Sequence, residues 1–251
     1  MKKITGFIGL FFILAFGHVN GQLPQPDVMQ VQDSTLIIQP VKHASLVLSY
    51  HQKNIYIDPS GGADLFKGTG TPNIILITDI HGDHMDIETL KALKTTNAVY
   101  VVPKAVADLL PKDLYKQELI VLNNSDKVKV GEIEITAVPM YNLPEQADSR
   151  HPKGRGNGYI LTIGGKRVYI SGDTEDTPEM RNLQNIDLAF VCMNLPYTMD
   201  IKQAADGVLA FKPAIVYPYH YRGQDTNQFK NFVNVVNPAI DVRLRDWYAG
   251  K

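Results

Sequence analysis

The sequence contains a single cysteine among its 251 residues. One cysteine excludes a disulfide within the chain, and it also excludes a cysteine-rich structural zinc site. Cys192 lies inside the apolar run 189–193, where a buried, unreactive thiol is expected rather than a nucleophile. The hydrophobic core must therefore provide the stability of the fold.

The chain also lacks an excess of charge of either sign. It has 25 Lys and Arg residues against 26 Asp and Glu residues, for a formal net charge of -1. A balanced charge gives no general attraction toward polyanions, so no nucleic-acid partner is indicated. A small-molecule substrate is the expected partner, and nothing in the sequence indicates an oligomeric state.

Only the N-terminus carries a long hydrophobic run. Lys2 and Lys3 precede an apolar stretch at 4–17 and the small-residue end Val19-Asn20-Gly21, the layout of a cleaved secretory signal. The stretch is short for a membrane span, although an uncleaved anchor is the alternative. We therefore expect a signal peptide at 1–21 and an exported protein, periplasmic or secreted, with no stable membrane span after cleavage.

No Ser/Gly/Pro-rich linker interrupts residues 22–251, which predicts a single domain. Its two halves show a similar order of strands and helices. The first half has predicted strands at 35–39, 45–50, 54–58, 73–78 and 98–102 and helices at 87–93 and 105–110. The second has strands at 119–122, 127–130, 132–138, 159–163, 167–171, 188–192 and 214–219 and helices at 178–183 and 201–211. Two such halves predict two packed sheets with helices outside, a four-layer α/β architecture.

Ligand-type side chains follow several of these strands. Residues 78–86 read TDIHGDHMD directly after an apolar strand, which places Asp79, His81, Asp83 and His84 within six positions. Asp173 and His220 follow two later strands, and His151 lies in the loop 140–158. Sites in open α/β sheets lie beyond the carboxyl ends of strands, and imidazole and carboxylate groups suit zinc, manganese or iron.

These segments resemble a known family. The loop at 78–84 is similar to the Thr-His-x-His-x-Asp-His signature of the metallo-β-lactamase superfamily, and 171–174 and 219–221 are similar to its Gly-Asp-Thr and terminal His elements. Residues 138–142 and 151–154 are similar to the subgroup of ascorbate 6-phosphate lactonase-like hydrolases. The resemblance covers roughly residues 35–245, and the ordered set of motifs is more specific than any one of them.

The resemblance implies an αββα sandwich with two divalent metal ions, zinc first and manganese or iron as alternatives. Asp79, His81 and His151 would bind one ion, and Asp83, His84 and His220 the other, with Asp173 bridging. A metal-bound hydroxide would then be the nucleophile of a hydrolase, with Asp83 and Asp173 as catalytic carboxylates. Asp83 or a neighbouring histidine would move the proton to the leaving group.

Asp79 departs from the family pattern, which has histidine at this position. An aspartate adds negative charge and favours a harder metal. Two alternatives stay open: a two-metal site persists, or the first site is weak and one metal does the work. A further alternative is that Asp79 does not bind metal itself but orients a ligand histidine.

Cationic residues near the candidate ligands bear on the class of substrate. Lys153, Arg155 and Arg222 favour an anionic ester, phosphodiester or lactone, with plain surface charge as the alternative. His43, Tyr141, Asn142, Lys153 and Arg222 are the predicted substrate-binding residues. A noncatalytic metal-binding envelope protein that kept the fold is the competing hypothesis, and a di-iron oxidoreductase is disfavoured because no flavin segment is present. Asp86 is predicted to cap the helix that follows it.

Overall fold

The computed structural model describes residues 23–32 and 34–248, so the predicted signal peptide at 1–21 lies outside the described residues. The first half of the chain forms one seven-stranded sheet, whose strands lie in chain order. These strands are β1 (Asp27–Val31), β2 (Ser34–Lys42), β3 (Ser45–Tyr50), β4 (Lys53–Ile57), β5 (Ile74–Leu76), β6 (Val99–Val102) and β7 (Glu118–Val121). Strands β1 to β4 pair antiparallel, and β4 to β7 pair parallel.

The second half forms the other seven-stranded sheet, also in chain order. Its strands are β8 (Lys127–Val130), β9 (Ile133–Met140), β10 (Gly156–Ile163), β11 (Lys166–Ile170), β12 (Leu188–Cys192), β13 (Ile215–Tyr219) and β14 (Asp241–Val242). Strands β8 to β11 pair antiparallel, and β11 to β14 pair parallel. The two halves of the chain therefore repeat one strand pattern.

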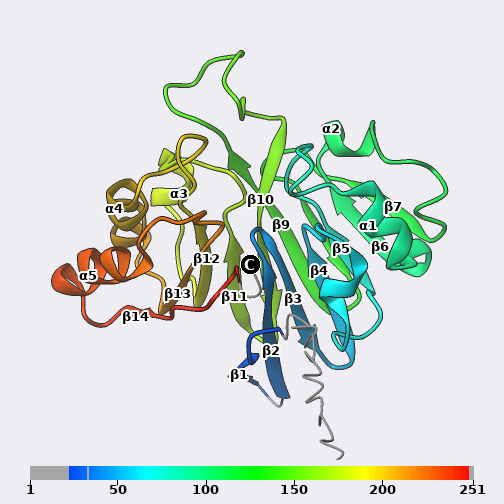
Figure 1. Cartoon of the computed structure of the whole chain (residues 1–251), viewed down its shortest axis with the longest axis horizontal. Coiled ribbons are helices and arrows are strands. Elements are labelled where there is room, and N and C mark those ends of the chain that lie inside the picture. Colours follow the sequence, from blue (N-terminus) through cyan, green and yellow to red (C-terminus); the bar gives the residue numbers. More distant parts are fainter. Residues whose placement is uncertain (1–22, 33, 249–251) are drawn as a thin grey trace, which may run out of the picture.

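Helices cover the outer face of each sheet, and the two sheets face each other in the middle of the molecule (Figure 1). The first half contributes α1 (Ile87–Ala92), α2 (Lys104–Ala107) and the short 3₁₀ helices η1 (Ala63–Phe66) and η2 (Thr95–Asn97). The second half contributes α3 (Pro178–Arg181), α4 (Ile201–Phe211) and α5 (Thr226–Val236). The predicted four-layer αββα sandwich is confirmed.

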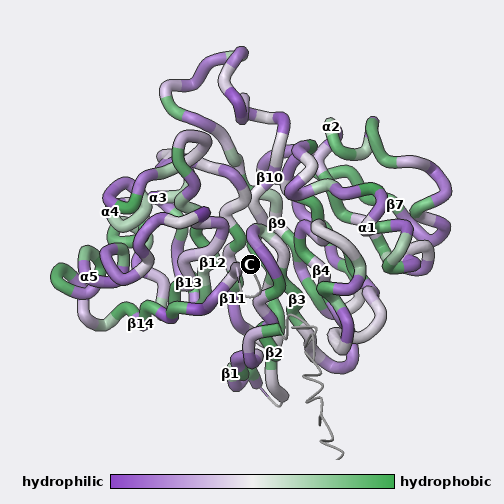
Figure 2. Tube along the Cα trace, viewed as in Figure 1, coloured by the Kyte–Doolittle hydropathy of each residue, from purple (hydrophilic) through white to green (hydrophobic). Residues whose placement is uncertain are grey.

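The core follows from the alternation of side chains along the strands. On β4, Ile55 and Ile57 belong to the large cluster between the sheets, whereas Tyr56 packs in the smaller cluster with Leu90 of α1. Every residue of β12 is buried, as expected for a strand covered on both faces. In Figure 2, hydrophobic segments lie along the strands of both sheets and also in the helices, whereas the loop between β9 and β10 is largely hydrophilic.

Some elements differ from the prediction. The helix expected at 105–110 is shorter and begins earlier, as α2, because residues 108–114 turn away in a loop. Strands β1 and β14 and helix α5 were not predicted. Over residues 23–32 and 34–248, no helix has both the length and the apolar character needed to cross a membrane.

Candidate metal centre

The loop after β5 folds into a tight turn that brings its polar residues to one edge of the sandwich. The backbone N–H groups of His84 and Met85 both donate to the carbonyl of His81, at 2.9 and 2.8 Å. Asp86 ends the turn as the N-cap of α1, because its side chain accepts the N–H of Thr89 at 3.1 Å. The predicted capping role of Asp86 is therefore confirmed, and the four candidate ligands before it lie next to the ends of other strands.

His84 is held in position by a carboxylate outside the predicted ligand set, that of Asp58. Asp58 follows β4, and its Oδ2 lies 2.8 Å from His84 Nδ1 and accepts the Thr78 hydroxyl at 2.6 Å. Its Oδ1 accepts the Thr78 N–H at 2.7 Å. Both Asp58 and His84 are fully buried. The contact orients the His84 ring so that Nε2 points toward the other candidate ligands, the usual role of a carboxylate behind a ligand histidine. The signal in the sequence was an acidic residue at the end of the predicted strand 54–58.

Asp173 lies at the centre of the cluster. Its Oδ2 is 3.3 Å from His84 Nε2 and 3.2 Å from His151 Nε2, and its Oδ1 is 3.2 Å from His220 Nε2. These three histidines come from three separate segments, and all are fully buried. The structure thus brings together the ligand-type groups that the sequence predicted on separate strand ends.

The contacts in this cluster are short, but several are not directed as hydrogen bonds. Asp173 Oδ1 and His151 Nε2 are buried and have no hydrogen-bond partner among the residues that the structure describes. The Nε2 atoms of His84 and His220 also face each other at 3.3 Å. Buried polar atoms without partners are costly, and a cation among them would satisfy them. The residues present therefore fit a divalent metal ion.

His151 reaches the cluster from the loop that joins β9 to β10. Its backbone N–H donates to Asn142 Oδ1 at 2.8 Å, and its Nδ1 lies 3.1 Å from the same oxygen. The Asn142 amide group donates in turn to Glu175 and to the Tyr197 carbonyl. Asn142 was predicted to bind substrate, but its side chain is occupied in fixing His151. It is a positioning residue here.

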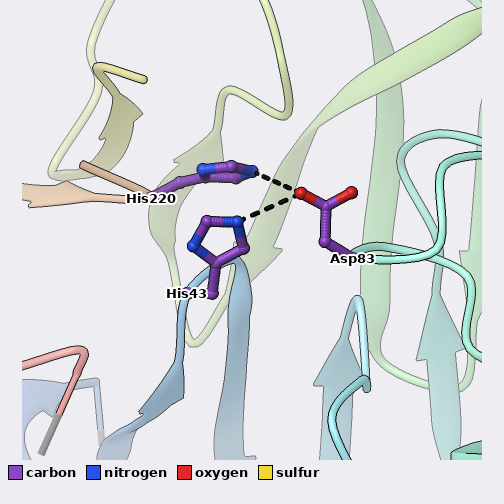
Figure 3. Close-up of side chains that lie close together, drawn as sticks. All are labelled: His43, Asp83 and His220. Atoms are coloured by element: carbon purple, nitrogen blue, oxygen red, sulfur yellow. Dashed lines mark hydrogen bonds and ion pairs between the residues drawn. The ribbon is translucent and has the colours of Figure 1, made fainter. Parts of the chain in front are cut away.

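Asp83 connects the cluster to His43, as Figure 3 shows. Asp83 Oδ2 lies 3.1 Å from His43 Nε2 and 3.6 Å from His220 Nε2. The hydroxyl of Tyr248 accepts the Arg222 N–H at 2.8 Å and lies 2.6 Å from His43 Nδ1. Because the charged Asp83 carboxylate can only accept, the contact at 3.1 Å is a hydrogen bond from His43 Nε2–H to Asp83. His43, predicted to bind substrate, therefore touches a candidate ligand directly.

The backbone is strained at the same edge. His43, Asp58, His220 and Arg222 all have positive φ angles, between 31° and 56°, although none is glycine. The His220 N–H donates to the His43 carbonyl at 3.1 Å, which ties the β2–β3 turn of one sheet to the end of β13 in the other. Left-handed conformations of such residues persist only where the surroundings fix them, and they gather at functional sites.

Asp79 occupies the position at which the sequence departs from the family pattern. It groups with His81 and His151 as one set of potential ligands, whereas His84, Asp173 and His220 form another and His43, Asp83 and His220 a third. Arg155 binds both oxygens of Asp79, with Nε 3.1 Å from Oδ1 and Nη2 2.9 Å from Oδ2. This partner was not predicted for Asp79.

The electrostatics of the cluster favour a cation. Burial acts to raise the pKa of Asp173, but the charge of His84 holds it well below its ordinary value, so the carboxylate is charged. Burial lowers the pKa of His220 to about 3, which leaves its ring neutral and able to bind a metal. Burial also opposes charge on His84, yet Asp173 and Asp58 raise its pKa well above normal. Anions that hold a proton on His84 would equally hold a metal ion in its place.

A pocket of about 370 Å³ opens beside Asp83 and His43. Two cationic side chains, Lys42 and Arg222, line it, and Tyr248 forms part of its wall. Lys42 was not among the predicted site residues.

Two predicted substrate-binding residues lie away from this pocket. The ammonium of Lys153 is 2.9 Å from Glu179 and 3.4 Å from Glu145, and it stacks over the Tyr141 ring at 4.6 Å. The Tyr141 hydroxyl donates to Glu179 at 2.7 Å. Through these contacts, Lys153 and Tyr141 of the β9–β10 loop bind Glu179 of α3.

Two packed sheets with buried histidines and carboxylates at one edge define a hydrolase class that uses metal ions to activate water. Comparison with known proteins agrees with this class. Residues 37–220 match the family model of the beta-lactamase superfamily domain. A UPF0173 metal-dependent hydrolase from Pyrococcus furiosus is 31% identical over 199 residues, which is 72% of this chain and 85% of that protein.

Solved structures give the same result. A protein from Parabacteroides distasonis, provisionally described as a metal-dependent hydrolase, is 38% identical, with a TM-score of 0.80 over 88% of this chain and 98% of that one. A metallo hydrolase from Ignicoccus hospitalis shares the fold, with a TM-score of 0.70 at 23% identity over 84% of this chain and 95% of that one. The chain belongs to the β-lactamase superfamily and, within it, to the UPF0173 metal-dependent hydrolases.

Proposed function

We propose that this metal-dependent hydrolase cleaves a small anionic ester, phosphodiester or lactone. The observation that carries the proposal is the pocket beside Asp83, because Lys42 and Arg222 line it together. The other carboxylate in the pocket wall, Asp86, is occupied as a helix cap and accepts the N–H of Gly61 at 3.0 Å. Two cations next to the cluster would attract and orient the negative group of a substrate.

The ligand set supports zinc, and manganese or iron also fit it. The candidate ligands are imidazole nitrogens and carboxylate oxygens without a thiolate, since Cys192 is buried and has Thr174 as its partner. When bound, such an ion supplies an activated water at neutral pH and polarises the bond to be cleaved.

The chain's own residues supply positioning and proton movement. Asp58 and Asn142 hold the rings of His84 and His151. Asp83 is partly exposed, with a side-chain accessibility of 34%, and lines the pocket. Burial acts to raise its pKa, but the hydrogen bond from His43 and the charge of His84 hold it below the ordinary value. The carboxylate is therefore charged, and its position in the pocket wall places it to accept a proton from water and to pass it to the leaving group.

The test compares turnover of phosphodiester, ester and lactone reporter substrates by the parent, Asp173→Ala and Asp187→Ala. Asp187 is the matched control because it precedes β12 at the end opposite the cluster, where it binds Lys166 at 2.8 Å. We expect Asp173→Ala to lose at least about 100-fold in kcat/KM on the best reporter, and the control to keep it. Circular dichroism confirms that each variant is folded.

The anionic substrate class has its own test. Arg222→Ala should raise KM for an anionic reporter by roughly 10-fold while changing KM for a neutral analogue little, because only the anion uses the guanidinium. Equal effects on both reporters contradict the assignment. Equal background rates for the parent and Asp173→Ala on every reporter contradict hydrolysis of these substrates and favour the noncatalytic metal-binding alternative.

A further inference from the structure

Asp79 and Arg155 form a bidentate ion pair inside the metal centre. Both guanidinium contacts lie within hydrogen-bond distance, at 2.9 and 3.1 Å, and Asp79 is fully buried. The side chain of Arg155 is only 20% exposed. His81 Nδ1 also approaches Asp79 Oδ2, at 2.6 Å. Asp79 therefore already has strong partners on both of its oxygens, and a planar guanidinium is the cation best matched to a carboxylate.

The pair depends on close packing between the loop after β5 and the start of β10. A Cβ added to Gly156, the residue next to Arg155, would lie 2.8 Å from the Thr78 carbonyl oxygen. The Asn157 N–H donates to that same carbonyl at 2.9 Å. The absence of a side chain at Gly156 thus allows the backbone that carries Arg155 to lie directly against the backbone that carries Asp79. The ion pair is built into the fold at this point.

The ion pair removes Asp79 from the carboxylates that are available to a metal ion. The Arg155 guanidinium covers both oxygens of Asp79 and compensates its charge. Among residues 23–32 and 34–248, by contrast, Asp83 and Asp173 have histidines and no Lys or Arg as ion-pair partners. A metal ion bound at Asp79 would lie next to a fixed guanidinium, and two neighbouring cations repel each other.

We propose that the Arg155 guanidinium takes the place of one of the two metal ions, so that this chain holds a single divalent ion at His84, Asp173 and His220. Asp79 then serves as the anchor of Arg155, and the set Asp79, His81 and His151 does not bind a second ion firmly. The inference rests on the proposed metal centre and specifies how much metal that centre takes.

The test measures metal content per chain by elemental mass spectrometry, on protein purified without added metal or chelator. Zn²⁺ is also titrated by calorimetry into the same proteins after metal removal. The parent is compared with Asp79→His/Arg155→Gln, which restores a neutral histidine and removes the competing cation. Arg150→Gln is the matched control, since Arg150 is on the same loop but is exposed, and its guanidinium lies over the Tyr197 ring, 4.5 Å from the ring centre. Thermal unfolding checks that each variant is folded.

We expect about one ion per chain for the parent and for Arg150→Gln, and about two for the double variant. Two ions per parent chain, or a folded double variant that stays at one, would overturn the inference while leaving the hydrolase proposal intact. No ion bound by the parent, even with excess Zn²⁺, would overturn the proposed metal centre itself. The parent's stoichiometry decides the matter even where the double variant does not fold.

Discussion

Replacing Asp58 with asparagine should weaken metal binding although Asp58 is not itself a candidate ligand. The two oxygens of Asp58 accept hydrogen bonds from His84 Nδ1, the Thr78 hydroxyl and the Thr78 N–H, at 2.8, 2.6 and 2.7 Å. An asparagine has one oxygen and one NH₂ group. Whichever way the amide is turned, its NH₂ faces an N–H donor, either at Thr78 or at His84.

The magnitude follows from this mismatch. An unsatisfied buried donor costs about 1–3 kcal/mol of stability, and for a chain of this size that lowers Tm by roughly 2–10 °C. Loss of the carboxylate behind a ligand histidine typically reduces metal affinity by about 10–100-fold, because the ring loses its fixed tautomer and orientation. We expect Asp58→Asn to show both effects.

The assay is competition for Zn²⁺ between the protein and a chelating dye, beside a thermal melt. Asp27→Asn is the control, because it also removes a partly buried carboxylate that accepts hydrogen bonds. Asp27 lies on β1, and Arg245 and Tyr217 donate to it. The control should lose stability and keep its Zn²⁺ affinity. A folded Asp58→Asn protein with Zn²⁺ affinity within about twofold of the parent would refute the positioning role.

Three further predictions concern other parts of the chain. Partial burial acts to raise the pKa of Asp27, but hydrogen bonds from Arg245 and Tyr217 outweigh it and lower the pKa below its ordinary value of 3.8. Asp27 therefore stabilises the fold above that pH, and its contribution is lost as the pH falls through the lowered pKa. In urea melts, the free energy of unfolding of Asp27→Asn should fall less in acid than that of the parent. Parallel plots of this free energy against pH for the two proteins would contradict the prediction. Burial raises the pKa of the Cys192 thiol to about 12, so a thiol reagent should react with it only after denaturation, and rapid labelling of the native protein would argue against the buried position. Mass analysis of exported protein should find an N-terminus near Gln22, whereas an intact Met1 would contradict signal cleavage.

The sequence predicted the architecture well because its elements carry strong local signals. Apolar runs of four to eight residues mark strands such as β12 and β13, and their order determines which ones lie side by side in each sheet. The edge strands β1 and β14 were missed, since short strands with few partners carry little pattern. Helix α5 was missed because its interior is rich in asparagine and its apolar face is narrow: among its residues only Phe229 and Val233 are buried.

The sequence by itself determined which residue types stand at the ends of the strands, and therefore that imidazoles and carboxylates gather at one edge. Only the tertiary structure decided how they are used. The partners of the site residues come from segments far away in the chain: Asp58 contacts His84, and Lys42 lines the same pocket as Asp83. No local spacing links Arg155 to Asp79 across 76 positions. Such pairings depend on the way two sheets pack and on where a glycine allows two backbones to approach. The physical reason is that the order of residues along the chain decides which residue types follow each strand. Contacts in space between distant segments decide the charge, orientation and partners of those side chains.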